Sequence, residues 1–148
     1  MAFQSVDLRD ETVSYVPNEL LGRLLGRRLN AVVFSMDYVI LWFDGDPEGR
    51  SNVTLNCDVY PKVERDGVVH AEQDPGYGDA LRAFIPEEVT RTVESTGVGI
   101  EIHFASGRLV LHPTPDELVG PEIAMLSGFE DRSWMVWRPG EESFEDLA

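Results

Sequence analysis

Residues 29–43 read LNAVVFSMDYVILWF, and this stretch decides the fold class. Two runs rich in β-branched and aromatic residues, 29–34 and 38–43, flank the short segment 35–37. Such runs separated by a tight connection are typical of a β-hairpin. The sequence therefore predicts two neighbouring antiparallel strands here.

The strand predicted at 38–43 is apolar on both faces. Successive side chains of a strand point to opposite faces. Both resulting sets are apolar: Val39, Leu41 and Phe43 on one face, and Tyr38, Ile40 and Trp42 on the other. A strand of this kind must be covered on both faces. The second cover is another part of this chain, a second copy of it, or a partner protein.

Further strands follow the same logic. Residues 53–59 alternate between apolar and polar side chains, and Asp66–Gly67 is a strong hairpin signal. Strands are also predicted at 89–94, 99–104, 108–112 and 133–138, and short helices at 17–26, with Asn18 as N-cap, and at 79–84. A hairpin through 105–107 pairs Phe104 with Arg108 and Glu101 with Leu111. Residues 1–16 are expected to form a loosely held arm or an edge strand, and 116–126 to be partly helical at most, because Gly120–Pro121 interrupts them.

The order of elements suggests an internal repeat, with a short helix followed by a β-meander in residues 18–60 and again in 78–113. We therefore predict one α+β domain over residues 1–148. Its core is antiparallel and β-rich, built as packed sheets or a half-barrel with two or three short helices. The acidic tail at 139–148 is expected to be solvated.

Charge is the second feature that restricts function. The chain has 148 residues, with 27 Asp and Glu against 12 Lys and Arg, and a formal net charge of -15. Such a chain repels nucleic acid and anionic lipid, and it attracts a basic protein partner. No apolar run is long enough to span a membrane, and the first residues lack the pattern of a signal peptide, so we expect a cytoplasmic protein.

Motifs that would indicate an enzyme are missing from the sequence. There is no nucleophile elbow, phosphate loop or dinucleotide fingerprint, and we expect no cofactor. The loop DGDPEGRSN at 44–52 lacks the glutamate that closes a calcium loop, and the three histidines lack metal-binding spacing, so no metal site is predicted. Cys57 is expected to be a core residue. One enzymatic alternative stays open, in which His103 and Glu101 act as an acid–base pair or line a ligand pocket.

The leading hypothesis is therefore a non-enzymatic binding protein. Acidic residues steer a basic partner, and an aromatic patch then docks it. The candidate contact residues comprise aromatic or aliphatic anchors and acidic charge partners: Tyr38, Ile40, Trp42, Trp134 and Trp137, with Asp44, Asp46, Glu48, Glu141 and Glu142. A homodimer across Tyr38, Ile40 and Trp42 is the alternative.

The pattern LLGRRLNAVVF, YVILWFDG, SGRLVLHP and SWMVWRPGE resembles small uncharacterised acidic proteins of high-GC Gram-positive bacteria. In size and acidity the chain is also similar to the immunity proteins of bacterial toxin systems. That second resemblance implies an inhibitor that binds and blocks a basic toxin domain.

Overall fold

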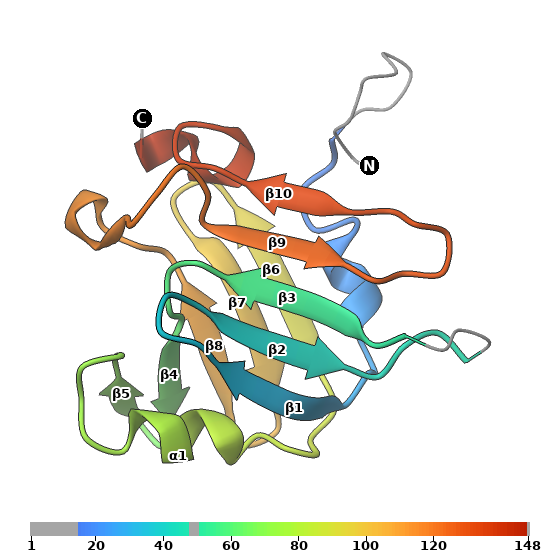
Figure 1. Ribbon diagram of the computed structural model, residues 1–148, viewed down its shortest axis with the longest axis horizontal. Helices are drawn as coiled ribbons and strands as arrows, with labels where there is room; N and C mark the ends of the chain where they lie inside the picture. The colour runs from blue at the N-terminus through green and yellow to red at the C-terminus, as the bar shows by residue number, and fades with distance from the viewer. Residues whose placement is uncertain (1–14, 48–50, 148) are drawn as a thin grey trace.

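Two antiparallel sheets, each of five strands, form the body of the protein (Figure 1). The computed structural model describes residues 15–47 and 51–147. Sheet 1 has the strand order β1-β2-β3-β9-β10, and sheet 2 has the order β5-β4-β8-β7-β6. The strands of sheet 1 are β1 (Leu29–Phe34), β2 (Val39–Phe43), β3 (Val53–Cys57), β9 (Ala124–Ser127) and β10 (Met135–Trp137). Those of sheet 2 are β4 (Lys62–Arg65), β5 (Val68–His70), β6 (Arg91–Ser95), β7 (Gly99–Phe104) and β8 (Gly107–Leu111).

Helical structure is confined to short pieces at the margins of the sheets. The α-helix α1 covers Tyr77–Arg82, and the 3-10 helices are η1 (Leu21–Leu24), η2 (Pro115–Glu117) and η3 (Glu142–Leu147). The β-rich α+β prediction is confirmed at this level. The first predicted meander, β1-β2-β3, lies in sheet 1 and the second, β6-β7-β8, in sheet 2. Their origin by duplication stays a prediction.

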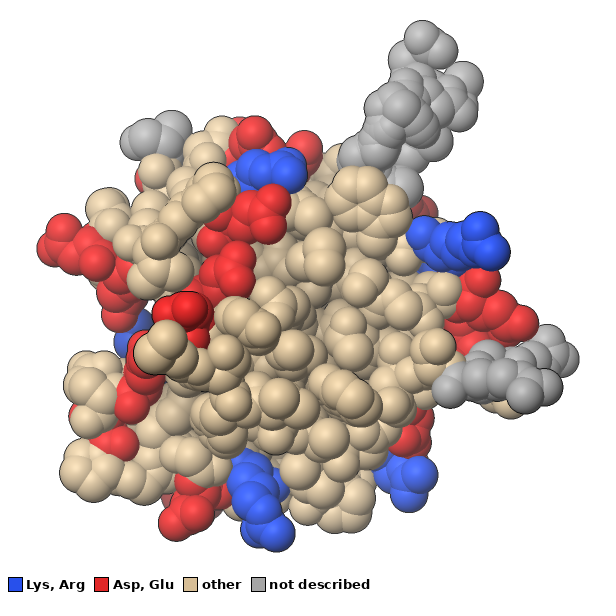
Figure 2. Space-filling model, viewed as in Figure 1, with Lys and Arg blue, Asp and Glu red and all other residues tan. Residues whose placement is uncertain are grey.

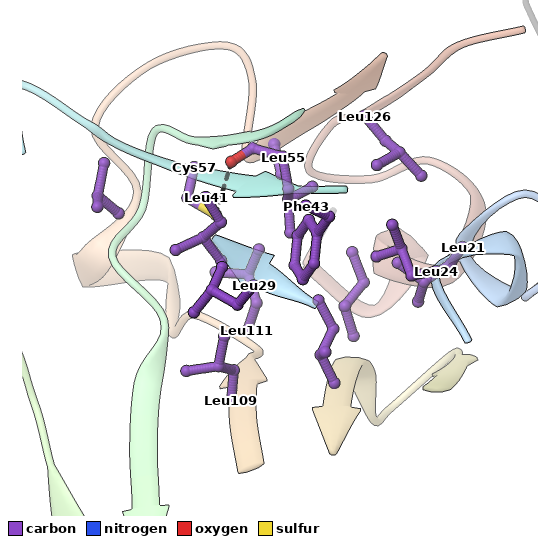
Figure 3. Packing of buried hydrophobic residues seen from close by; sticks show 14 of the residues in the cluster. Leu21, Leu24, Leu29, Leu41, Phe43, Leu55, Cys57, Leu109, Leu111 and Leu126 are labelled. Atoms are coloured by element: carbon purple, nitrogen blue, oxygen red, sulfur yellow. Dashed lines mark hydrogen bonds between the residues drawn. The ribbon is translucent and has the colours of Figure 1, made fainter. Parts of the chain in front are cut away.

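The alternating strands bury one face each against the other sheet. Leu41, Leu55 and Cys57 of sheet 1 lie opposite Leu109 and Leu111 of sheet 2 (Figure 3). All the buried apolar side chains belong to one cluster. The space left between these five residues and their neighbours is only about 10 Å³, roughly the room for one water molecule. The core therefore holds no cavity for a ligand at this point, and the prediction that Cys57 is a core residue is confirmed.

A buried carboxyl group ties both ends of the described chain to β6. Glu94 accepts hydrogen bonds from the Trp137 Nε1 (2.8 Å), from the Ser143 hydroxyl (3.0 Å) and from the backbone N–H of Asn18 (2.8 Å). The Tyr15 hydroxyl also bonds to it. Burial raises the pKa of Glu94, although these donors act in the opposite direction. Since both carboxylate oxygens accept hydrogen bonds from residues of this chain, Glu94 is best explained as a structural link.

The hairpin predictions differ in their success. The turn at Asp66–Gly67 joins β4 and β5, and both residues have positive φ (55° and 76°), as a two-residue hairpin turn requires. The register predicted for β7 and β8 is wrong by one residue. Phe104 pairs with Gly107, and Glu101 pairs with Val110, because the turn contains two residues and not three.

Two further predictions for the second half are wrong. Residues 116–126 were expected to be partly helical at most; the segment begins within η2, but its last residues belong to β9, which pairs between β3 and β10. The tail expected to be solvated forms η3, where Phe144 is fully buried. Asn18 does not cap η1 with its side chain; its backbone has a φ of 69°. The arm predicted at 1–16 lies outside the described residues except for Tyr15 and Val16.

Candidate functional site

The outer face of sheet 1, turned away from the core, carries two rows of side chains. Strand pairing aligns each row across the sheet. The first row contains Val33, Ile40, Asn56, Met125 and Val136, and the second contains Ala31, Trp42, Thr54 and Ser127. Trp134, just before β10, extends the second row, because Met135 pairs with Leu126 on the opposite face. We call this set the outer face of sheet 1.

No position of this face holds an acidic or basic residue. Figure 2, which views the molecule from this side, shows a broad uncharged area over the strands of sheet 1, with charged residues confined to its borders. Val33, Met125 and Trp134 are 39%, 38% and 42% exposed. Interfaces between proteins are depleted of charge at their centre and enriched in aromatic residues and methionine. The face therefore has the composition of a docking surface.

The outer face of sheet 2 is built differently. Glu101 Oε1 accepts hydrogen bonds from His103 Nε2 (2.8 Å) and Arg108 Nη1 (3.1 Å), and Glu64 pairs with Arg108 Nη2 at 2.8 Å. Two of these residues, Glu101 and His103, were the acid–base candidates. They do lie together, but on the open face of a sheet, where Arg108 holds the carboxylate. Neither residue lines the hollow of about 260 Å³ or the small space in the core between the two sheets.

Four of the five predicted aromatic and aliphatic anchors share the outer face of sheet 1 or its border. Ile40 and Trp42 are half-buried members of the two rows, and Tyr38, with the same strand parity, lies just before β2. The Trp42 Nε1 has no hydrogen-bond partner among the described residues. Trp134 is exposed on the same face.

Trp137 does not belong to this surface. Its side chain is fully buried, and its Nε1 donates to Glu94. The prediction that Trp137 anchors a partner is therefore wrong. Strand parity gives the reason: residues three apart in a strand point to opposite faces, so Trp134 and Trp137 cannot share one face.

The predicted acidic partners at one end of sheet 1 are already engaged. Asp44 accepts hydrogen bonds from Asn30 (3.0 Å) and Arg28 (2.7 Å), and these bonds lower its pKa. Asp46 pairs with Arg27 at 2.5 Å and accepts from the backbone N–H of Glu130, which lowers its pKa as well. We call this region, with the Arg23–Asp131 pair at 3.0 Å, the paired end. Glu48 lies outside the described residues.

The opposite end of the sheet is acidic. Asp37 precedes β2 and Asp58 follows β3. Because these two strands are antiparallel, both residues lie at the same end of the sheet. Beside Asp58 is a hollow of about 260 Å³ whose charged lining residues are Asp58, Lys62, Glu72, Asp116 and Glu117. We call Asp37, Asp58, Glu72 and Asp116 the acidic end. Figure 2 shows acidic residues along this left border of the face.

The charges of the acidic end are only partly compensated. Lys62 pairs with Glu117 at 3.2 Å, whereas the described residues supply no ion pair to Asp58, Glu72 or Asp116. Burial raises the pKa of Asp58, and repulsion from Glu122 adds to that rise. Sequence reasoning missed this region, because its four acids come from four separate segments that only the fold brings together.

The predicted tail acids have local roles. Glu141 lies 3.8 Å from Arg138, which also pairs with Glu122 at 3.3 Å. Burial raises the pKa of Glu142, and neighbouring carboxylates, Glu141 first among them, add to the rise. Neither residue lies in the rows of the outer face of sheet 1.

Over the described ranges 15–47 and 51–147, no group of three or more His, Cys, Asp or Glu side chains is placed to hold a metal ion. Within the same ranges no helix is long and apolar enough to cross a membrane. The chain matches no family model, no curated protein and no solved structure. The function must therefore be argued from the site alone.

Proposed function

We propose that this chain is a non-enzymatic binding protein that docks a basic partner protein on the outer face of sheet 1. The single observation that carries the proposal is the uncharged, mostly apolar and partly exposed face that runs across five strands of a chain with a net charge of -15. Exposed apolar patches of this kind mark interaction sites between proteins.

The proposal extends to the class of inhibitor that the sequence resembles, the immunity proteins that block a basic toxin domain. Two features support it. The chain offers an apolar surface for affinity, and its net negative charge would accelerate encounter with a basic partner. An inhibitor needs no catalytic residues of its own, so the engagement of Glu101 and His103 in a surface network fits this role.

The experiment compares two variants that add the same charge to opposite sides of the sandwich. Met125→Lys places a lysine in the outer face of sheet 1, and Val93→Lys places one in the outer face of sheet 2. Each immobilised variant is exposed to host lysate. The protein that the wild type retains is then purified and titrated against all three by calorimetry.

We expect Val93→Lys to bind like the wild type and Met125→Lys to bind at least ten-fold more weakly, since a desolvated lysine without a partner is costly in an interface centre. Equal affinities for both variants would refute the proposal. If the wild type retains only its own chain and sediments as a dimer that Met125→Lys dissociates, the occupant of the face is a second copy and not a basic partner.

A further inference from the structure

The two ends of the outer face of sheet 1 differ in how much charge they can offer to a partner. At the paired end, Asp44, Asp46 and Asp131 each have an arginine of this chain within 3.0 Å or less. A partner lysine would have to displace such an arginine to use these carboxylates. Because the exchange replaces one ion pair with another, it gains little free energy.

The acidic end has carboxylates without such partners. Asp58 shares the outward parity of Asn56 in β3, and its only side-chain donor among the described residues is the Asn56 amide at 3.1 Å. Glu72 and Asp116 line the adjoining hollow, where Lys62 already pairs with Glu117. This end therefore carries a net negative charge that a basic partner can contact.

Tyr60 connects this end to the sheet. Its hydroxyl donates to the backbone carbonyl of Ser35 at 2.7 Å and lies 3.1 Å from that of Tyr38, which fixes the β1–β2 turn beside the hollow. Tyr60 and Glu72 both line the hollow, and the pKa of Tyr60 is raised by burial first and then by the carboxylates of Glu72 and Asp37. The acidic end is a fixed part of the fold and continues directly into the apolar face.

We infer that the partner is a protein whose apolar patch is bordered on one side by lysine or arginine residues, and that these contact the acidic end, while Asp44, Asp46 and Asp131 at the paired end stay with their own arginines. The inference rests on the proposed function and adds an orientation to it. Complementary charge at one border raises the rate of association and fixes the register of docking more than it raises affinity. It also makes the association sensitive to salt.

A peptide with one apolar and one basic half tests the orientation. The probe is Trp-Leu-Trp-Leu followed by three arginines, with a nitroxide label at the basic terminus. The isotope-labelled full chain is titrated with it, and paramagnetic broadening of backbone amides locates the label. The triple variant Asp58→Asn, Glu72→Gln, Asp116→Asn is compared with Glu19→Gln, Asp66→Asn, Asp79→Asn, which removes the same charge from exposed positions elsewhere.

We expect shift changes along β2, β3 and β9, with broadening at Tyr38, Asp58 and Ile123. The acidic-end variant should bind the probe about five-fold more weakly at low salt, as the loss of three exposed ion pairs predicts, and the control variant should not. Broadening at Asp44 or Trp134 would overturn the orientation and leave the docking face intact. No saturable change on sheet 1 would overturn the proposed function itself.

Discussion

The two outer faces of the sandwich have the same architecture and opposite chemistry. On sheet 2, the outward positions carry a network in which Arg108 joins Glu64 and Glu101. On sheet 1, the equivalent outward positions are uncharged, and Met125 and Trp134 are exposed among them. Both sheets bury an apolar inner face, so folding does not require this difference. The proposed docking role of the outer face of sheet 1 rests on this difference.

The largest expected effect is on stability and concerns Trp137, the buried one of the two tryptophans near the C-terminus. Trp137→Ala removes a fully buried side chain and should lower the free energy of unfolding by about 4 kcal/mol, because it leaves a cavity and takes away one of the hydrogen-bond donors to Glu94. Urea denaturation followed by circular dichroism measures this. A loss below 1 kcal/mol would mean that Trp137 is not the core residue described here.

The next effect concerns the charge inside the sandwich. Glu94→Gln places an amide NH₂ group against the N–H of Trp137 or of Asn18, both of which can only donate. We expect a loss of about 2 to 3 kcal/mol in the free energy of unfolding. If Gln proves as stable as Glu at pH 7, the hydrogen bonds do not demand a carboxylate.

The difference in stability between the wild type and Glu94→Gln is predicted to depend on pH. Since the folded pKa of Glu94 is raised above its unfolded value, its stabilising contribution is full below the unfolded pKa and is lost as the pH rises through the folded pKa. The stability advantage of the wild type over Glu94→Gln should therefore be larger at acid pH than at neutral pH. Denaturation curves of both proteins between acid and neutral pH provide the measurement. A stability advantage of the wild type that grows with pH would contradict the prediction.

A smaller effect, on binding and not on folding, is expected at the exposed tryptophan. Trp134→Ala should weaken the complex with the partner by about 2 kcal/mol, since aromatic anchors dominate interfaces, and should change the free energy of unfolding by less than 1 kcal/mol. Calorimetry of the complex and urea denaturation of the free protein measure the two quantities. The reverse result would make Trp134 a structural residue.

The smallest effect falls on the other side of the sandwich. Glu101→Gln removes the carboxylate that bonds His103 and Arg108, at a cost of about 1 kcal/mol in the free energy of unfolding. Partner affinity should be unchanged. A loss of affinity in this variant would place the docking surface on sheet 2 and cancel the contrast between the faces.

Much of the fold could be predicted, because the signals are local. Runs of β-branched and aromatic residues predicted β1 and β2, alternation predicted β3, and the Asp66–Gly67 turn joins β4 to β5. Strand β9 was missed, since Gly120–Pro121 shortly before it suggested a broken helix, and only pairing with β3 and β10 defines the strand. The burial of Phe144 could not be predicted either, because it depends on packing against residues that are distant in the sequence.

The candidate site could be predicted only in its apolar half. The double-sided pattern of residues 38–43 identified Ile40 and Trp42, and strand parity would also have separated Trp134 from Trp137. The charge partners could not be predicted, because the sequence does not show that Arg27 and Arg28 reach Asp46 and Asp44. Those ion pairs join residues that are far apart in the sequence.

The most direct test of the docking face is hydroxyl-radical footprinting of the protein with and without its purified partner. Met36, at the β1–β2 turn, is 90% exposed, and Met125 and Trp134 are exposed on the outer face of sheet 1. We predict that the partner protects these three side chains and leaves His103 on sheet 2 unchanged. Protection of His103 with no change at Met125 and Trp134 would contradict the central claim.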